Sequence, residues 1–149
     1  MLLHALQLLR GASSVDDHHT AEDTFLALGE AFAVALGPRK GLRRFGDAHA
    51  PLDEALARAV IDISSRPFFV GDFGFQNPTI GSLTSQMIPH ALQSFSQTAR
   101  VTLHVDVLRG ANDHHRAEAA FKALAVATRQ ATERVKGFEG EVVSTKGVL

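Results

Sequence analysis

The sequence predicts an α+β fold that contains a repeated unit, on three observations. The segment DHHTAE at 17–22 returns as DHHRAE at 113–118, and the likeness continues downstream to Phe25 and Phe121. Apolar residues three and four apart in both copies indicate two long helices. Strict alternation of apolar and polar residues in VTLHVDVL, at 101–108, indicates a strand.

The first third of the chain is predicted to be helical and then irregular. Residues 1–10 are expected to form a short amphipathic helix that ends at Gly11. The next helix begins at Asp16 or Asp17, either of which can cap it, and runs to about Leu36, before Gly37-Pro38. The segment PRKGLRRFGDAHAP, at 38–51, is expected to be a polar, basic loop. Its cations could be solvated or could receive an anion.

Strand patterns begin near Leu56. AVIDI at 59–63 and PFFVGDF at 67–73 flank the turn-forming SSRP, which predicts a hairpin, and a short strand is expected around Ile80. The segment 85–99 is helical, and the strand at 101–108 leads through Arg109-Gly110 into the second copy of the repeat. The tail from Gly137 has no periodicity, so STKGVL at its end could be loose or could fold back over a site.

The repeat extends upstream, where its two copies differ. MLLHALQ at 1–7 echoes MIPHALQ at 87–93, which places His4 opposite His90. The second copy continues into the strand VTLHVDVL, whereas GASSV follows in the first. We therefore expect a shortened first half-repeat of helices only at 1–37. A second half-repeat at 38–149 would hold a hairpin, a helix, a strand, a helix and the tail.

Composition excludes several classes of partner. The 149 residues are 45% hydrophobic, which suffices for one domain or two small halves sharing a core. Net charge is −1, and no basic stripe is interleaved with aromatic residues, so we expect neither nucleic acid nor membrane as a partner. There is no cysteine, hence no disulfide and no thiol catalysis. The expected location is the cytoplasm.

The repeated HHxxE pattern predicts metal binding. Adjacent helical residues point about 100° apart, so His18 and His19 cannot easily serve one small site together. Glu22 lies beside both of them, three and four residues on, so one such helix can offer ligands to two neighbouring metal positions. A single HH pair is usually a solvated surface feature, but two copies with Glu at the same offset favour a metal. Imidazole and carboxylate together suit a borderline divalent ion.

Several motifs together resemble the imidazoleglycerol-phosphate dehydratase family of histidine biosynthesis. They are DDHHTAED, RRFGDAHAPLDEALARAV, SSRPFF, MIPHALQSF, TLHVDVLRGANDHHRAEAAFKALA and STKGVL, and the resemblance covers nearly all of residues 16–149. It implies a duplicated α+β half-domain with helices on one face of a sheet, a two-layer sandwich like domain 2 of ribosomal protein S5. It also implies trimers that assemble into a 24-subunit shell with manganese between subunits.

The resemblance also implies a hydro-lyase that converts imidazole glycerol phosphate to imidazole acetol phosphate. Two Mn²⁺ ions per active site would be held by His18, His19, Glu22, His90, His114, His115 and Glu118. Glu22 or Glu118 would act as the acid/base. The substrate phosphate would be bound by Arg44, Arg66, Lys122, Ser144 and Lys146. Asp53-Glu54 could also lie near the site, with no role assigned.

One departure from the family pattern leaves two readings of the function of the chain. The family carries strands and another metal-binding histidine before its first HHxxE motif, whereas 15 residues precede Asp16 here. His4 could be that histidine or the one that follows it. The chain is thus either a working metal-dependent lyase with a shortened first half, or an inactive relative that serves at most as a structural subunit. A metal store is less favoured, because a store needs no basic anion-receiving residues.

Overall fold

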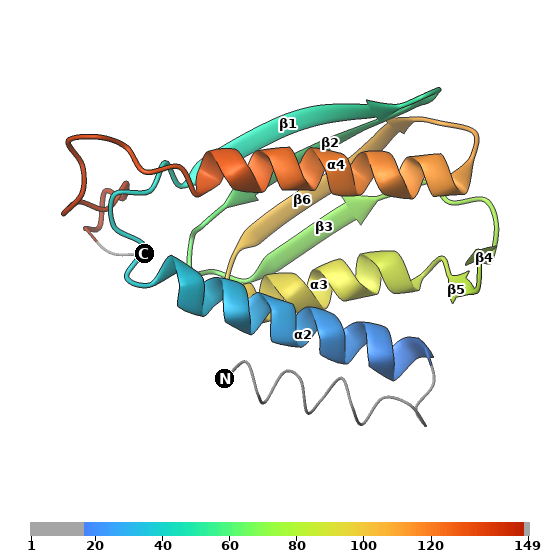
Figure 1. The fold of residues 1–149 in the computed structure, drawn as a ribbon, viewed down its shortest axis with the longest axis horizontal. Helices are drawn as coiled ribbons and strands as arrows, with labels where there is room; N and C mark the ends of the chain where they lie inside the picture. The colour runs from blue at the N-terminus through green and yellow to red at the C-terminus, as the bar shows by residue number, and fades with distance from the viewer. Residues whose placement is uncertain (1–16, 148–149) are drawn as a thin grey trace.

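The computed structural model describes residues 17–147 and confirms the α+β fold (Figure 1). Its elements are α2 (Asp17–Leu36), β1 (Phe45–Leu52), β2 (Ala55–Asp62), β3 (Phe68–Asp72), β4 (Thr79–Ile80), β5 (Leu83–Thr84), α3 (Met87–Ala99), β6 (Thr102–Arg109) and α4 (Asp113–Ala131). Both HHxxE helices, the helix between them and the strand at 101–108 are confirmed. The helix expected at 1–10 lies outside the described residues.

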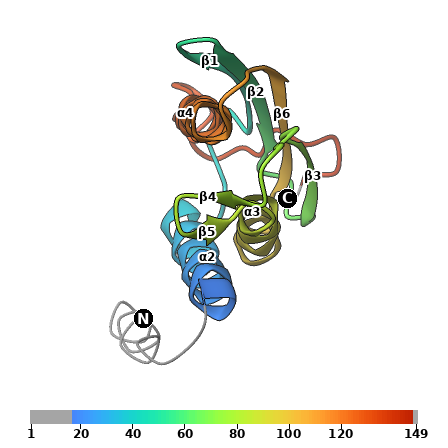
Figure 2. The same ribbon diagram turned by 90° about the vertical axis from the view of Figure 1, so that its right-hand side faces the viewer.

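The main sheet has four strands in the order β1-β2-β6-β3. β2 runs antiparallel to both β1 and β6, whereas β3 runs parallel to β6. The β3–β6 pair needs a crossover connection, which α3 provides. Figures 1 and 2 show α3 and α4 on one face of the sheet and α2 lying against α3, farther from the sheet. The first turns of all three helices lie at the same end of the molecule.

Small side chains let α4 lie close to the sheet. The facing surfaces of β1, β2 and α4 bury a set of alanines: Ala48, Ala50, Ala55, Ala57, Ala59, Ala117, Ala119, Ala120, Ala123, Ala127 and Ala131. A Cβ built on Gly46 would lie 1.9 Å from the carbonyl oxygen of Ala127, so β1 and the α4 backbone touch there. Ile61, Leu103 and Val105 are fully buried and fill the centre of the sheet.

Two strand predictions were wrong. Residues 45–51 were expected to lie in a loop but belong to β1, whose buried positions Gly46, Ala48 and Ala50 carry small residues instead of the β-branched ones that mark a strand. The predicted hairpin of 59–63 with 67–73 does not exist, because β6 lies between β2 and β3. The hairpin is instead β1–β2, closed by Asp53-Glu54.

The division into half-repeats stays a prediction. Residues 17–37 hold α2 and no strand, and residues 1–16 lie outside the described part. Two apolar residues of α2, Leu28 and Val34, are 52% and 59% exposed. Within residues 17–147, no helix is long and apolar enough to cross a membrane.

Replacing Gly29 with alanine is expected to destabilise the protein at the α2–α3 crossing. A Cβ there would lie 2.1 Å from Thr98 Oγ1 and 2.6 Å from the Phe95 carbonyl oxygen. Backbone cannot move aside as a side chain can, so overpacking at about 1–3 kcal/mol outweighs the helix-propensity gain of up to about 1 kcal/mol. Urea denaturation measures the change. Gly140→Ala is the control, because nothing lies within 4 Å of its Cβ position. An unchanged midpoint for Gly29→Ala would contradict the close crossing.

Candidate functional site

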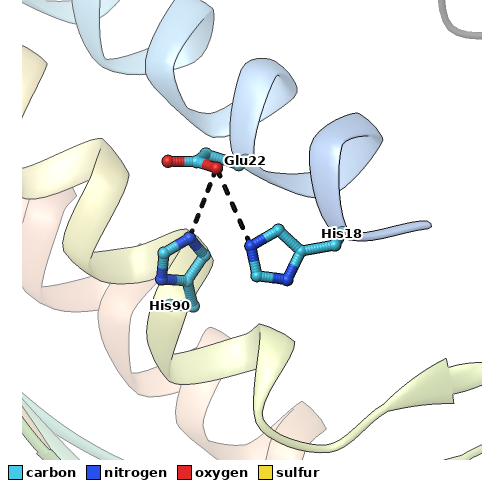
Figure 3. Close-up of side chains that lie close together, drawn as sticks. All are labelled: His18, Glu22 and His90. Carbon is cyan, nitrogen blue, oxygen red and sulfur yellow. Dashed lines mark ion pairs between the residues drawn. The ribbon is translucent and has the colours of Figure 1, made fainter. Parts of the chain in front are cut away.

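Three of the predicted ligands meet between α2 and α3. His18 and Glu22 come from the first turns of α2, and His90 comes from the first turn of α3 (Figure 3). One oxygen of Glu22, Oε2, lies 3.9 Å from His18 Nε2 and 3.5 Å from His90 Nε2. The three ligand atoms all lie within 4.8 Å of one another. Within residues 17–147, no other group of three His, Asp or Glu residues gathers so closely.

The group fits a divalent cation. His90 Nε2 is buried and makes no hydrogen bond to any described residue, a costly state for a polar atom unless something else binds it. Nitrogen and oxygen ligands lie about 2.0–2.2 Å from an ion such as zinc, so two of them on one ion are about 3–4.4 Å apart. The observed separations need little adjustment to meet that condition. His18, Glu22 and His90 are therefore the residues that would hold an ion here.

The second HHxxE motif repeats the local geometry of the first. The rings of His114 and His115 lie 6.0 Å apart and nearly edge to face, and those of His18 and His19 lie 5.8 Å apart in the same manner. His114 Nε2 lies 3.4 Å from Glu118 Oε2. The sequence repeat is thus also a repeat of side-chain placement on the helix.

The start of α4 is held by several polar contacts. Asn112 caps the helix, its side-chain oxygen accepting from the backbone N–H groups of His114 and His115. Asp113 is buried and accepts from the backbone N–H groups of Gln76 and Asn77, which ties the segment after β3 to this helix. Burial raises the pKa of Asp113, but these hydrogen bonds, a further one from the Asn77 side chain and the nearby charge of Arg116 together outweigh it and leave the pKa below its ordinary value.

Glu54 is a site residue to which the sequence assigned no role. It accepts a 2.7 Å hydrogen bond from His115 Nδ1. This bond, with those from the backbone N–H groups of Asn112 and Ala111, lowers the pKa of Glu54 to about 2. The same bond raises the pKa of His115. Glu54, Asn77, Ile80 and His114 line a cavity of about 600 Å³ at the start of α4.

Four of the five predicted phosphate-binding residues share a second cavity of about 910 Å³. Arg44, Arg66, Ser144 and Lys146 line it, although they are far apart in the sequence. Arg100, which the sequence analysis did not single out, also lines this cavity. It is the residue that ends α3, and its backbone is left-handed. Tail residues 143–146 line this cavity, so the tail folds back over it. The backbone N–H of Gly41, which donates to the carbonyl of Glu141, holds the start of the tail.

Asp62 orients the two arginines of this cavity. Its carboxylate accepts from Arg44 Nε at 2.7 Å and from Arg44 Nη2 at 3.1 Å, and it lies 3.5 Å from Arg66 Nη2. Arg44 also donates through Nη1 to the carbonyl of Val143. Lys122, the fifth predicted residue, lies elsewhere: its Nζ donates to the Pro51 carbonyl at 2.8 Å. The cavity thus gathers several cations around one carboxylate, which suits an anion.

Fold and site together define an α+β protein whose repeated helices present paired histidines and a glutamate at their first turns. The cavity lined by cations lies at the opposite end of α3, where Arg100 ends that helix. A sequence model of the imidazoleglycerol-phosphate dehydratase family matches residues 5–128. The chain therefore belongs to the imidazoleglycerol-phosphate dehydratase family.

Individual relatives agree with that placement. The Neurospora crassa imidazoleglycerol-phosphate dehydratase is 65% identical over 140 residues, which are 94% of this chain and 61% of the relative. The Saccharomyces cerevisiae enzyme of the same name is 57% identical over 139 residues, 93% of this chain and 62% of the relative. The chain spans about three fifths of the length of these curated relatives.

Solved structures share the fold. The Staphylococcus aureus imidazoleglycerol-phosphate dehydratase has a TM-score of 0.78 and 32% identity, covering 90% of this chain and 82% of that one. The Pyrococcus furiosus enzyme, crystallised with (S)-C348, has a TM-score of 0.79 and 32% identity, covering 99% and 85%.

Proposed function

We propose that this chain is a metal-dependent hydro-lyase that dehydrates imidazole glycerol phosphate to imidazole acetol phosphate in histidine biosynthesis. The observation that carries the proposal is the His18, Glu22 and His90 group, in which a buried imidazole nitrogen without a hydrogen bond faces a carboxylate. The choice of substrate rests on the family and on the names of the relatives. The proposed place of action is the cytoplasm.

The proposed metal is Mn²⁺, with two ions per active site as the family resemblance implies. When bound, the ion would favour the deprotonated form of the substrate imidazole and so assist loss of the neighbouring hydroxyl. His18, Glu22 and His90 would hold one ion. His19, His114, His115 and Glu118 are the remaining proposed ligands, on the same two motifs.

Side chains of this chain supply the remaining functions. Glu22 or Glu118 would take the proton from the carbon next to the one that loses the hydroxyl. Arg44, Arg66, Ser144 and Lys146 would bind the phosphate, since a dianion needs several cations or hydroxyls in one place. Lys122 stays a candidate for phosphate binding, although it does not line this cavity. A homo-oligomer, of trimers or up to 24 subunits as in the family, is proposed to complete the active sites.

The alternative is a catalytically inactive relative that serves as a structural subunit. Size-exclusion chromatography with light scattering, with and without Mn²⁺, combined with an assay for imidazole acetol phosphate, separates the two. A large particle that depends on Mn²⁺ and turns over supports the dehydratase. A species that ignores Mn²⁺ and forms no product contradicts the dehydratase and supports the alternative.

A further inference from the structure

Both oxygens of the Glu54 carboxylate are committed. Oε1 accepts from the backbone N–H groups of Ala111 and Asn112 at 3.0 and 2.9 Å, and Oε2 lies 2.7 Å from His115 Nδ1. Two backbone donors fix one oxygen, so the direction in which the other points is fixed as well.

The segment that carries Glu54 is itself well placed for this contact. Glu54 belongs to the two-residue connection of the β1–β2 hairpin, in which Asp53 adopts a positive φ of 44°. Asn112 takes part in both directions: its backbone N–H donates to Glu54, while its side chain caps α4 and accepts from the His115 N–H. The hairpin turn and the helix start are thus joined around one carboxylate.

This arrangement selects one tautomer of His115. An ionised carboxylate only accepts hydrogen bonds, so His115 must donate from Nδ1. A neutral ring with its proton on Nδ1 keeps a lone pair on Nε2, the form in which imidazole binds a metal. Histidines that bind metals commonly donate their other ring N–H to a carboxylate in this way.

We propose that Glu54 is a positioning residue that holds His115 in the Nδ1–H tautomer and directs its Nε2 to a divalent cation. The metal-binding part of this inference rests on the proposed function. The choice of tautomer does not, because the Glu54–His115 contact is formed without an ion.

Glu54→Gln tests the proposal, because it keeps one half of the interaction and reverses the other. The glutamine oxygen can still accept from Ala111 and Asn112, so the hairpin stays anchored to α4. Its NH₂ group then faces His115 Nδ1, which must become an acceptor and move the ring proton to Nε2.

The first readout is the tautomer of His115 in the metal-free full chain, from ¹⁵N NMR of the ring nitrogens assigned by comparison with His115→Asn. We expect Nδ1–H in the wild type and Nε2–H in Glu54→Gln. An Nε2–H tautomer in the wild type overturns the proposal, whether or not the variant folds. An unchanged tautomer in Glu54→Gln also overturns it, since Glu54 would then only anchor the turn.

The second readout is Mn²⁺ affinity, from the electron paramagnetic resonance signal of free Mn²⁺. Loss of a carboxylate behind a ligand histidine commonly weakens binding about 10- to 100-fold, and we expect that loss for Glu54→Gln. Glu133→Gln is the matched control, an exposed glutamate just beyond α4, and should bind like the wild type. Equal affinities for both variants overturn the metal-binding part. A wild type that binds no Mn²⁺ overturns the proposed function and this part with it, whereas the NMR result still decides the tautomer.

Discussion

Replacing Glu22 with glutamine is expected to weaken Mn²⁺ binding by more than the roughly 100-fold that loss of an outer-shell partner can cost. Glu22 Oε2 is the atom that His18 Nε2 and His90 Nε2 both approach, at 3.9 and 3.5 Å. Glutamine keeps the shape but loses the negative charge. A divalent ion would then be left with two neutral imidazoles in this group. Titration with Mn²⁺, read from the free-ion signal in electron paramagnetic resonance, measures the loss.

Glu30→Gln is the control for this experiment. Glu30 is exposed on the same helix and lies outside the metal group, so its variant should bind Mn²⁺ like the wild type. Thermal unfolding without metal should give similar midpoints for both variants, because neither removes buried apolar area. Full Mn²⁺ binding by Glu22→Gln would show that the group between α2 and α3 is not a metal centre.

Replacing Arg44 with methionine is expected to weaken binding of inorganic phosphate about 10- to 100-fold, the cost of one hydrogen bond to a charged group. Arg44 is held by both oxygens of Asp62 and by stacking on Phe45, with its guanidinium 4.6 Å from the ring centre. This support orients the cation before an anion arrives, so little ordering cost remains. Calorimetric titration with phosphate measures the change, and with active enzyme KM should rise more than kcat falls.

Two further variants make the result specific to the cavity. Arg66→Met should weaken phosphate binding as well, because Arg66 lines the same cavity. Among the described residues Arg66 makes no hydrogen bond to the tail, whereas Arg44 donates to Val143. A loss of affinity in Arg66→Met therefore reflects loss of charge and not loss of a contact with the tail. Lys122→Met should leave phosphate affinity unchanged, because Lys122 does not line this cavity. Equal losses for all three variants would point to net charge alone and contradict a defined anion site.

The fold could be predicted wherever one pattern ran long. The helices α2 and α4 show apolar spacing over 20 and 19 residues, and β6 alternates over eight. The strand pairing could not be predicted, because pairing between strands that are neighbours in the chain is the usual expectation. Here β6, which follows β3 in the chain, lies between β2 and β3 in the sheet. β1 was missed because its buried face is glycine and alanine, whose small size matters only against α4.

The site shows the same division. The motifs indicated His18, Glu22 and His90, and the fold brings these three together. Glu54 depends on where the β1–β2 turn lies, which could not be known while β1 was read as a loop. Arg100 reaches the cavity from the end of α3, and Lys122 is turned toward Pro51. No sequence pattern predicts where Arg100 and Lys122 lie, because both positions depend on tertiary packing.

The position of α2 has a consequence for local opening of the protein. This helix rests on α3, farther from the sheet, and its apolar residues Leu28 and Val34 are exposed. Elements with few buried contacts open at lower free energy than the core, and their amide hydrogens exchange sooner. A cation shared by α2 and α3 would bind only the closed arrangement and would therefore slow exchange in α2 in proportion to its concentration. The ion would then stabilise the docked position of α2 in addition to its chemical role, and the ion concentration would set how often this helix opens.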